Sequence, residues 1–216
     1  MSAHIYRHIA DLPGQIAVFP LPGAMLFPRW TLPLNIFEPR YLNMLDDIMA
    51  GERMLGMVQT AGGDRERPAL ARVGCAGRVT SFDETDDGRY LIALSGICRF
   101  EVREDVDVRT PYRQVRPGWS PYEADLHPPA RNDLPSRDLI VAALKSYVLR
   151  NDMSADWAAV ADAPVENLIH ALCAGCPFGI QEKQALLEAP TLMDRAEVLL
   201  ALLAMDLPGP GSGNMQ

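Results

Sequence analysis

The chain of 216 residues has little of several residue types that large classes of proteins depend on. Four cysteines over this length are too few for a disulfide scaffold, so we expect reduced thiols. Neither of the two lysines, Lys145 and Lys183, follows a glycine, which excludes the Gly-Lys-Ser/Thr end of a P-loop. No apolar run approaches the roughly 20 residues that span a bilayer. The first residues also lack the core of a signal peptide, so we expect a cytoplasmic protein without a membrane partner.

An excess of positive charge is missing as well. The formal net charge is −8; residues 1–118 hold 14 arginines against 15 acidic residues, and residues 119–216 hold 6 basic against 13 acidic residues. Nucleic-acid binding draws most of its affinity from cationic contacts to phosphate. The composition therefore disfavours a polyanionic partner.

Proline, in contrast, shapes the most informative stretch, residues 16–41, which reads IAVFPLPGAMLFPRWTLPLNIFEPRY. Proline fixes φ and donates no hydrogen bond, so this stretch is neither one helix nor a central strand. Its apolar residues still need burial. We predict short strands, each stopped by a proline, that wrap a small core, and then a helix that begins at Glu38-Pro39 and closes at Gly51.

Further strands are expected up to residue 118. Residues 53–60 are apolar enough for a buried strand, and residues 61–68 read as a loop. Asp86-Asp87-Gly88 between alternating segments predicts a hairpin, and Gly96 predicts a bulge or sharp bend in its return strand. Residues 119–135 are proline-rich and are typical of a connection.

Helical patterns follow this connection. Ser136 and Pro164 each precede an apolar stripe at helical spacing, and residues 181–188 form another helical segment. Thr191 and Asp194 have the spacing of a capping box that opens a last helix. By composition, residues 207–216 are a disordered tail.

FPLPGAMLFP followed by LPLNIFEPRY resembles the N-terminal, substrate-binding domain of the Lon protease family, in the standalone bacterial form without ATPase and protease domains. Later segments, Gly96–Phe100 among them, agree in order. The resemblance implies an α+β fold: a PUA-like, mostly antiparallel, partly closed β subdomain over residues 1–118, a connection over 119–135 and a helical bundle over 136–206. It implies a non-enzymatic module that binds unfolded or degron-bearing polypeptides, either as a free-standing adaptor in proteolysis, with a full-length Lon protease among the expected partners, or as a relic of the protease's recognition domain. A PUA-like RNA-binding protein and a hydrolase with an unrecognised site are the alternatives.

Three motifs that suggest catalysis or metal binding are better explained structurally. Lys145 and Ser146 are helical neighbours that point in different directions, so they form no Ser–Lys dyad. Cys173-Ala174-Gly175-Cys176 closes a helix instead of opening one; structural thiols are favoured over a redox pair or half a zinc site. Acidic pairs beside the hairpin turn are solvated. We expect no catalytic residue, no metal, no cofactor and no ATPase or protease activity.

The expected binding surface lies at the turn between the first strands and at the start of the helix. A tryptophan in a surface turn is either folded onto the core or presented to a partner. Glu38 has a second interpretation, as a helix N-terminal residue paired with an arginine such as Arg99. The predicted peptide-binding residues are Phe27, Trp30, Phe37, Glu38, Arg40 and Tyr41.

Overall fold

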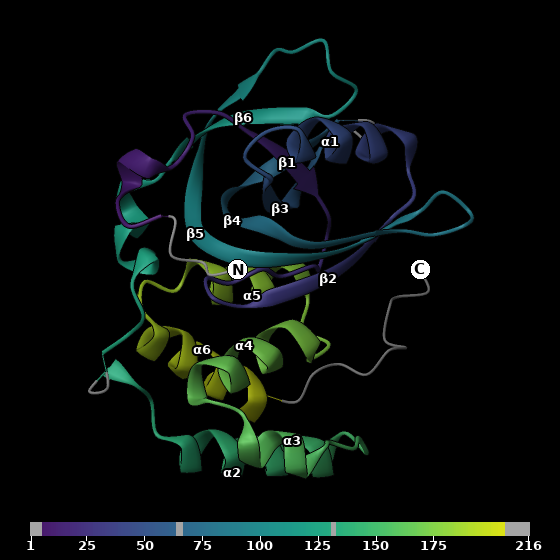
Figure 1. Cartoon of the computed structure of the whole chain (residues 1–216). Coiled ribbons are helices and arrows are strands. Elements are labelled where there is room, and N and C mark those ends of the chain that lie inside the picture. Colours follow the sequence, from purple (N-terminus) through teal and green to yellow (C-terminus); the bar gives the residue numbers. More distant parts are fainter. Residues whose placement is uncertain (1–5, 64–66, 131–132, 206–216) are drawn as a thin grey trace. The chain divides into compact units, whose positions relative to one another are not determined.

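The computed structural model describes residues 6–63, 67–130 and 133–205. The chain divides into two compact units, Met1–Pro128 and Pro129–Gln216, both drawn in Figure 1. The segment that we predicted as a connection starts within the first unit, because Trp119 is buried there and Ser120–Leu126 forms a 3-10 helix, η2. The expected tail, residues 207–216, lies outside the described residues.

The first unit is built on one mixed six-stranded sheet, and with the helices of the second unit it gives the α+β fold that we predicted. The sheet order is β2-β5-β4-β3-β1-β6, and β6 also pairs back with β5, so five of the strands close on themselves and β2 lies at an edge. All pairings are antiparallel except the one between β1 and β3. The elements are η1 (Ile9–Asp11), β1 (Ile16–Pro20), β2 (Thr31–Ile36), α1 (Pro39–Met49), β3 (Met54–Gly63), β4 (Pro68–Glu84), β5 (Tyr90–Val106) and β6 (Arg113–Gly118).

The proline-rich stretch forms β1, a turn, β2 and the start of α1. β1 ends at Pro20 as expected, but β2 continues through Pro33, which pairs with Ala93. A proline is tolerated there because β2 pairs with β5 alone among the described strands, so one of its edges needs no amide donor. Glu38 is the N-cap of α1 and Pro39 occupies its first turn, which confirms the predicted helix start.

Phe100 fills the interior of the closed strands because glycines make room for its ring. A Cβ on Gly56 would lie 2.9 Å, and one on Gly74 2.7 Å, from the ring atom Cζ. The ring also meets Trp119 edge-on at 5.7 Å between centroids. Side chains are therefore excluded at two positions of β3 and β4 so that one aromatic ring can occupy the core.

The hairpin and the bulge both lie where the sequence predicts them. β4 and β5 are joined through Gly88, whose φ of 76° suits glycine. On β5, Gly96 pairs with Gly77 and Cys98 with Ala76, so Ile97 is the extra residue of a bulge. A Cβ on Gly96 would lie 1.9 Å from the carbonyl oxygen of Phe27, so only glycine fits.

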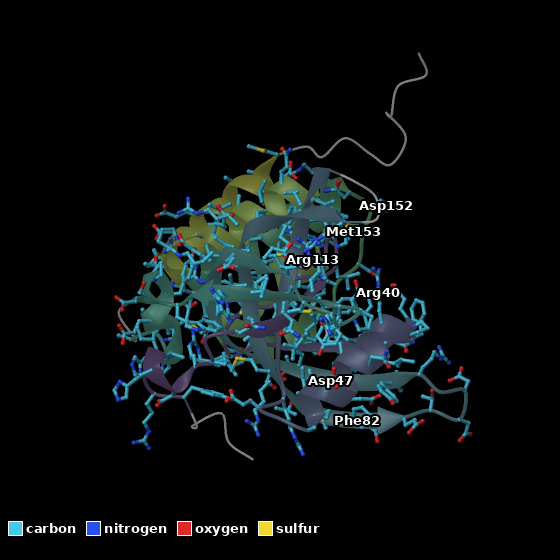
Figure 2. All side chains as sticks on the ribbon, turned by 90° about the horizontal axis from the view of Figure 1, so that it is seen from above. Arg40, Asp47, Phe82, Arg113, Asp152 and Met153 are labelled. Atoms are coloured by element: carbon cyan, nitrogen blue, oxygen red, sulfur yellow. The ribbon has the colours of Figure 1, made fainter. Side chains whose placement is uncertain are left out.

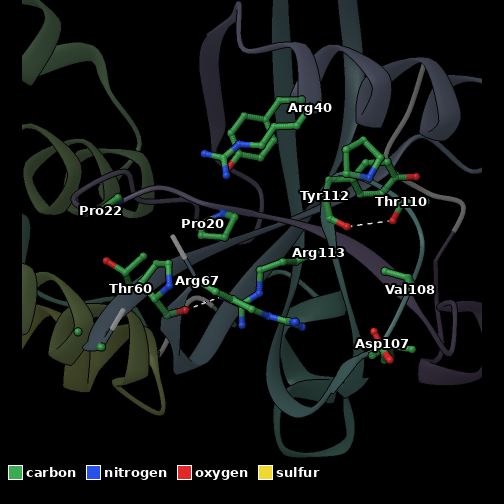
Figure 3. A pocket seen from close by; sticks show the side chains of 16 residues that line it. Pro20, Pro22, Arg40, Thr60, Arg67, Asp107, Val108, Thr110, Tyr112 and Arg113 are labelled. Atoms are coloured by element: carbon green, nitrogen blue, oxygen red, sulfur yellow. Dashed lines mark hydrogen bonds between the residues drawn. The ribbon is translucent and has the colours of Figure 1, made fainter. Parts of the chain in front are cut away.

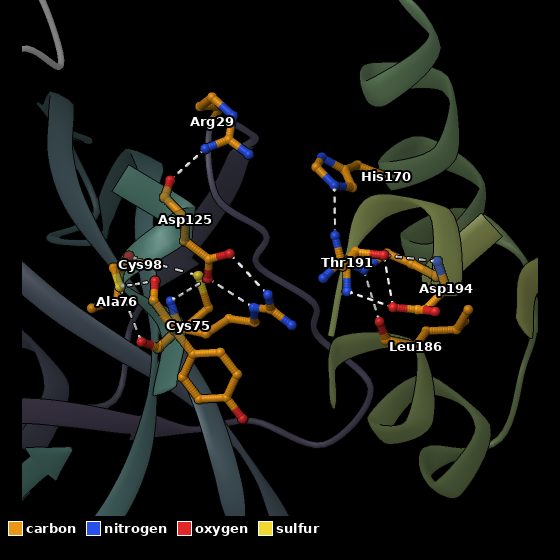
Figure 4. A network of polar contacts seen from close by, with 12 residues as sticks. Arg29, Cys75, Ala76, Cys98, Asp125, His170, Leu186, Thr191 and Asp194 are labelled. Atoms are coloured by element: carbon orange, nitrogen blue, oxygen red, sulfur yellow. Dashed lines mark hydrogen bonds and ion pairs between the residues drawn. The ribbon is translucent and has the colours of Figure 1, made fainter. Parts of the chain in front are cut away.

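Arg99 forms a buried ion pair with Asp125, which Figure 4 labels. Its Nε donates to Asp125 Oδ2 at 2.7 Å and its Nη2 to Oδ1 at 2.8 Å, in a bidentate arrangement. Our pairing of Arg99 with Glu38 was wrong: Glu38 binds Arg40 instead, at 2.8 Å. Asp125 also accepts the Arg99 amide at 3.1 Å, so the pair fixes η2 on the middle of β5.

The second unit consists of five helices among the described residues. Its last helix, α6, contacts α2, α4 and α5. Thr191 and Asp194 form both bonds of the predicted capping box (Figure 4), whereas Ser136 makes no side-chain cap bond. The helices are α2 (Arg137–Arg150), α3 (Trp157–Asp162), α4 (Val165–Gly175), α5 (Ile180–Glu188) and α6 (Leu192–Ala204).

A buried polar pair links three of these helices. Arg195 Nε donates to the Leu186 carbonyl at 2.8 Å, and its Nη1 lies 3.1 Å from His170 Nε2. A guanidinium only donates hydrogen bonds, so His170 Nε2 is the acceptor in this contact. This pair connects α4, α5 and α6.

We predict that Gly96→Ala destabilises the protein by more than about 3 kcal/mol, because the new methyl group overlaps backbone that cannot move without breaking the sheet. The matched control is Gly14→Ala, at a site where a Cβ meets nothing within 4 Å. Thermal unfolding followed by circular dichroism measures both. A Gly96→Ala protein that melts with the control would contradict the assigned close approach.

Candidate functional site

A pocket of about 530 Å³ lies beside the first turn of α1, and we call it the α1 pocket (Figure 3). Figure 2 locates Arg40, Asp47 and Arg113 on the elements around it. Four segments far apart in sequence line the pocket: the end of β1, the start of α1, the end of β3 with Arg67 and the start of β4, and the stretch from Val106 to Arg113 that joins β5 to β6.

The pocket walls are rich in proline. Pro20, Pro22, Pro68 and Pro111 line it, together with the half-buried Val106 and Val108. Proline offers an apolar ring and no amide hydrogen. These four prolines therefore give the pocket apolar surface and no amide donor.

Tyr41 and Arg40 form one side of the pocket. Tyr41 is buried against Phe19, with 4.3 Å between ring centroids, and this burial raises the pKa of its phenol. The Arg40 guanidinium lies 4.5 Å above the Tyr41 ring and 2.8 Å from Glu38. Arg40 is thus held by a cation–π contact and an ion pair.

Two arginines share a single carboxylate oxygen at the other side. Arg113 Nη2 lies 2.5 Å and Arg67 Nη2 3.2 Å from Asp105 Oδ2. Arg113 also donates to the Pro68 carbonyl at 2.5 Å, and its side chain is 18% exposed, against 60% for Arg67. Arg113 is therefore the fixed member of the pair, while Arg67 is solvated and held by one long contact.

Tyr112 ties the β5–β6 loop to α1. Its hydroxyl donates to Asp47 Oδ2 at 2.7 Å, and its carbonyl accepts from the Thr110 hydroxyl at 2.9 Å. Burial, with the Asp47 carboxylate, raises the pKa of Tyr112 to about 12. The neutral phenol thus holds the loop against the helix at physiological pH.

The structure does not bring the six predicted binding residues into one groove. Phe27 is fully buried, so its assignment to a binding surface was wrong. Its apolar ring is part of the core. Trp30 is half-buried in the predicted turn, where its amide donates to the Phe27 carbonyl. β2 then runs six residues, roughly 20 Å, before Phe37.

The other four predicted residues lie together at the start of α1. Phe37 is 63% exposed, and Glu38 follows it and pairs with Arg40. Arg40 and Tyr41 line the α1 pocket. Sequence reasoning missed Arg67, Tyr112 and Arg113, which come from segments more than 25 residues downstream. No spacing in the sequence places these three residues beside α1.

The cysteines show no sign of reactivity. All four are buried thiols outside any disulfide. Burial raises the pKa of Cys173 to about 12 and that of Cys176 to about 11. A thiol that stays protonated is a poor nucleophile and metal ligand. Among the described residues, no group of three or more His, Cys, Asp or Glu side chains is placed to hold a metal ion, and no helix is long and apolar enough to cross a membrane.

Comparisons with known proteins agree on one family. The family model of the ATP-dependent protease La (LON) substrate-binding domain matches residues 15–205. A Lon protease of Anaeromyxobacter dehalogenans is 26% identical over 89% of this chain and 23% of its own length, and Lon protease 1 of Herpetosiphon aurantiacus is 31% identical over 47% of this chain and 13% of its own length. The chain thus spans less than a quarter of these relatives.

Two solved structures have the same fold. A Lon N-terminal domain protein from Xanthomonas campestris aligns with a TM-score of 0.59 at 23% identity, over 87% of this chain and 97% of its own. The N-terminal domain of a Mycobacterium avium complex Lon protease aligns with a TM-score of 0.58 at 13% identity, over 89% and 100%. At these identities the alignments show the fold alone.

We predict that Tyr112→Phe lowers stability by about 1 kcal/mol, because Asp47 loses a buried donor. Tyr90→Phe is the control, since Tyr90 makes the same kind of bond to Asp46 at 3.0 Å but at an exposed site, and should change stability by less than half as much.

The wild-type bond favours the neutral phenol, so the folded pKa of Tyr112 exceeds the unfolded value of about 10. The contribution of this bond to the free energy of unfolding is complete below pH 10 and is lost as the pH rises toward 12. When the tyrosines are titrated with base and followed by absorbance, the ionisation at the highest pH should therefore be missing from Tyr112→Phe. An unchanged titration would contradict the assigned bond.

Proposed function

The chain belongs to the LON substrate-binding domain family, and from this membership we propose that it is a non-enzymatic polypeptide-binding module whose binding site is the α1 pocket. The observation that carries the proposal is the pocket itself: apolar proline walls with a few fixed polar side chains at the start of α1. Arg40 and Tyr41 line it, and we propose Phe37 and Glu38 as its entrance.

Size and rigidity support a short peptide segment as the ligand. A volume of about 530 Å³ falls within the usual range of ligand sites and accommodates a few residues. Proline rings lose little entropy when a ligand binds, so the walls are preorganised. An unfolded segment still loses its own freedom on ordering, and we expect a Kd of roughly 1 μM or weaker.

We propose that the ligands are unfolded or degron-bearing polypeptides, and that the module delivers them in the cytoplasm as an adaptor in proteolysis. The support is that the relatives carry the name Lon protease and that this chain corresponds to less than a quarter of their length. A full-length Lon protease is the proposed partner. We infer that this chain itself hydrolyses neither ATP nor protein.

Trp30 is not part of the proposed pocket. It lies at the opposite end of β2 from Arg40, so a segment of a few residues in the pocket does not reach it. Trp30 therefore serves as a control for nonspecific binding to aromatic side chains outside the pocket.

The test is a titration of fluorescently labelled β-casein, an unfolded protein, with the full chain, followed by anisotropy. Val108→Ser removes part of the pocket wall and should weaken binding about fivefold, the equivalent of about 1 kcal/mol. Leu91→Ser, on an exposed part of β5, and Trp30→Ala should leave the affinity within twofold. No casein binding, or equal losses in all three variants, would refute the assignment to this pocket.

A further inference from the structure

Among the arginines that line the α1 pocket, Arg67 is the one held least by other groups of the protein. Its one ion pair in the described structure, to Asp105 Oδ2, is 3.2 Å long, and its side chain is 60% exposed. Arg113 Nη2 binds the same carboxylate oxygen at 2.5 Å, so Asp105 keeps a cationic partner when Arg67 leaves. An exposed ion pair of this kind contributes little to stability, so Arg67 leaves it at little cost.

Three other side-chain donors of the pocket already bind protein oxygens. Arg40 is bound to Glu38 through both Nε, at 3.0 Å, and Nη2, at 2.8 Å. The hydroxyls of Thr110 and Tyr112 donate to protein oxygens. The proline walls have no amide hydrogens to offer. The group best able to bind a polar ligand atom is therefore a cation whose planar fork matches a carboxylate.

We propose that the α1 pocket selects polypeptide segments that carry a carboxylate next to apolar side chains, and that Arg67 binds this carboxylate. This inference rests on the proposed function and names its substrate class. The apolar neighbours of the carboxylate lie on the walls around Val106 and Val108, and Arg113 with Asp105 stays in place beneath. The carboxylate is an acidic side chain or a free C-terminus, which share one chemistry.

Asp107 sets the limit of this selectivity. It also lines the pocket, and a second carboxylate near a bound one repels it. The two residues therefore have opposite predicted effects on an acidic ligand: Arg67 attracts it and Asp107 repels it. A role of either residue in folding alone would not produce opposite signs.

The experiment uses the full chain and three fluorescent peptides of the same apolar sequence. The first has a central Glu and an amidated C-terminus, the second has Gln and a free C-terminus, and the third has Gln and an amidated C-terminus. Anisotropy should show that one or both of the first two bind about fivefold more tightly than the neutral third. Which of the two does so identifies the source of the carboxylate.

Three variants complete the test. Arg67→Gln should remove the fivefold preference and Asp107→Asn should increase it about twofold, where the preference is the ratio of the Kd values of the neutral and acidic peptides for the same variant. Arg72→Gln is the matched control: Arg72 is an arginine of β4 that is 76% exposed, against 60% for Arg67, and it pairs with Glu101 at 2.8 Å outside the pocket. It should leave the preference unchanged. Raising the salt from 50 to 500 mM should reduce the preference, since the contact is exposed.

The outcomes separate the inference from the function beneath it. If the neutral peptide binds as tightly as both others, the carboxylate selectivity is overturned. If Val108→Ser still weakens binding of that peptide, the proposed function stands. Absence of binding by all three peptides overturns both. Tighter binding of a single-stranded RNA oligonucleotide, lost in Arg67→Gln, assigns the arginine to phosphate and overturns the inference.

Discussion

The close approach of Gly96 to the turn that precedes β2 sets the position of the candidate site. Gly96 donates to the Trp30 carbonyl at 2.8 Å and accepts from the Arg29 amide at 2.8 Å, so the turn lies directly on the bulge of β5. A side chain at position 96 would collide with the Phe27 carbonyl. This contact aligns β2 on β5, and the end of β2 determines where α1 begins. Arg40 and Tyr41 enter the pocket as a consequence.

Closure of the strands brings the rest of the pocket to the same place. β6 pairs with both β1 and β5, so the loop before it returns to the end of β1. The Tyr112–Asp47 bond then connects this loop to α1, and Arg113 reaches across to the start of β4 through the Pro68 carbonyl. Rigid proline walls beside the exposed Arg67 result from this arrangement. This is the surface at which we propose that a polypeptide segment binds.

Local signals in the sequence were sufficient for much of the fold. Pro39 at the first turn of α1, glycine in the Asp86–Gly88 turn, the Gly96 bulge and the Thr191–Asp194 capping box each depend on residues a few positions apart. The site depends on pairs distant in sequence, such as Arg67 with Asp105. Burial of Phe27 and the partner of Arg99 were missed for the same reason, because the core and η2 that receive them assemble only in the folded unit. No period or spacing encodes such contacts.

The central claim is that a polypeptide binds at the α1 pocket. The most direct measurement is an amide chemical-shift map of the full, isotopically labelled chain titrated with unlabelled β-casein. The account predicts shifts concentrated in three described segments of the first unit, residues 40–41, 60–63 and 106–113, with little change around Trp30. Shifts concentrated instead on α2 and α3, where Trp157 is exposed beside Lys145, would contradict it.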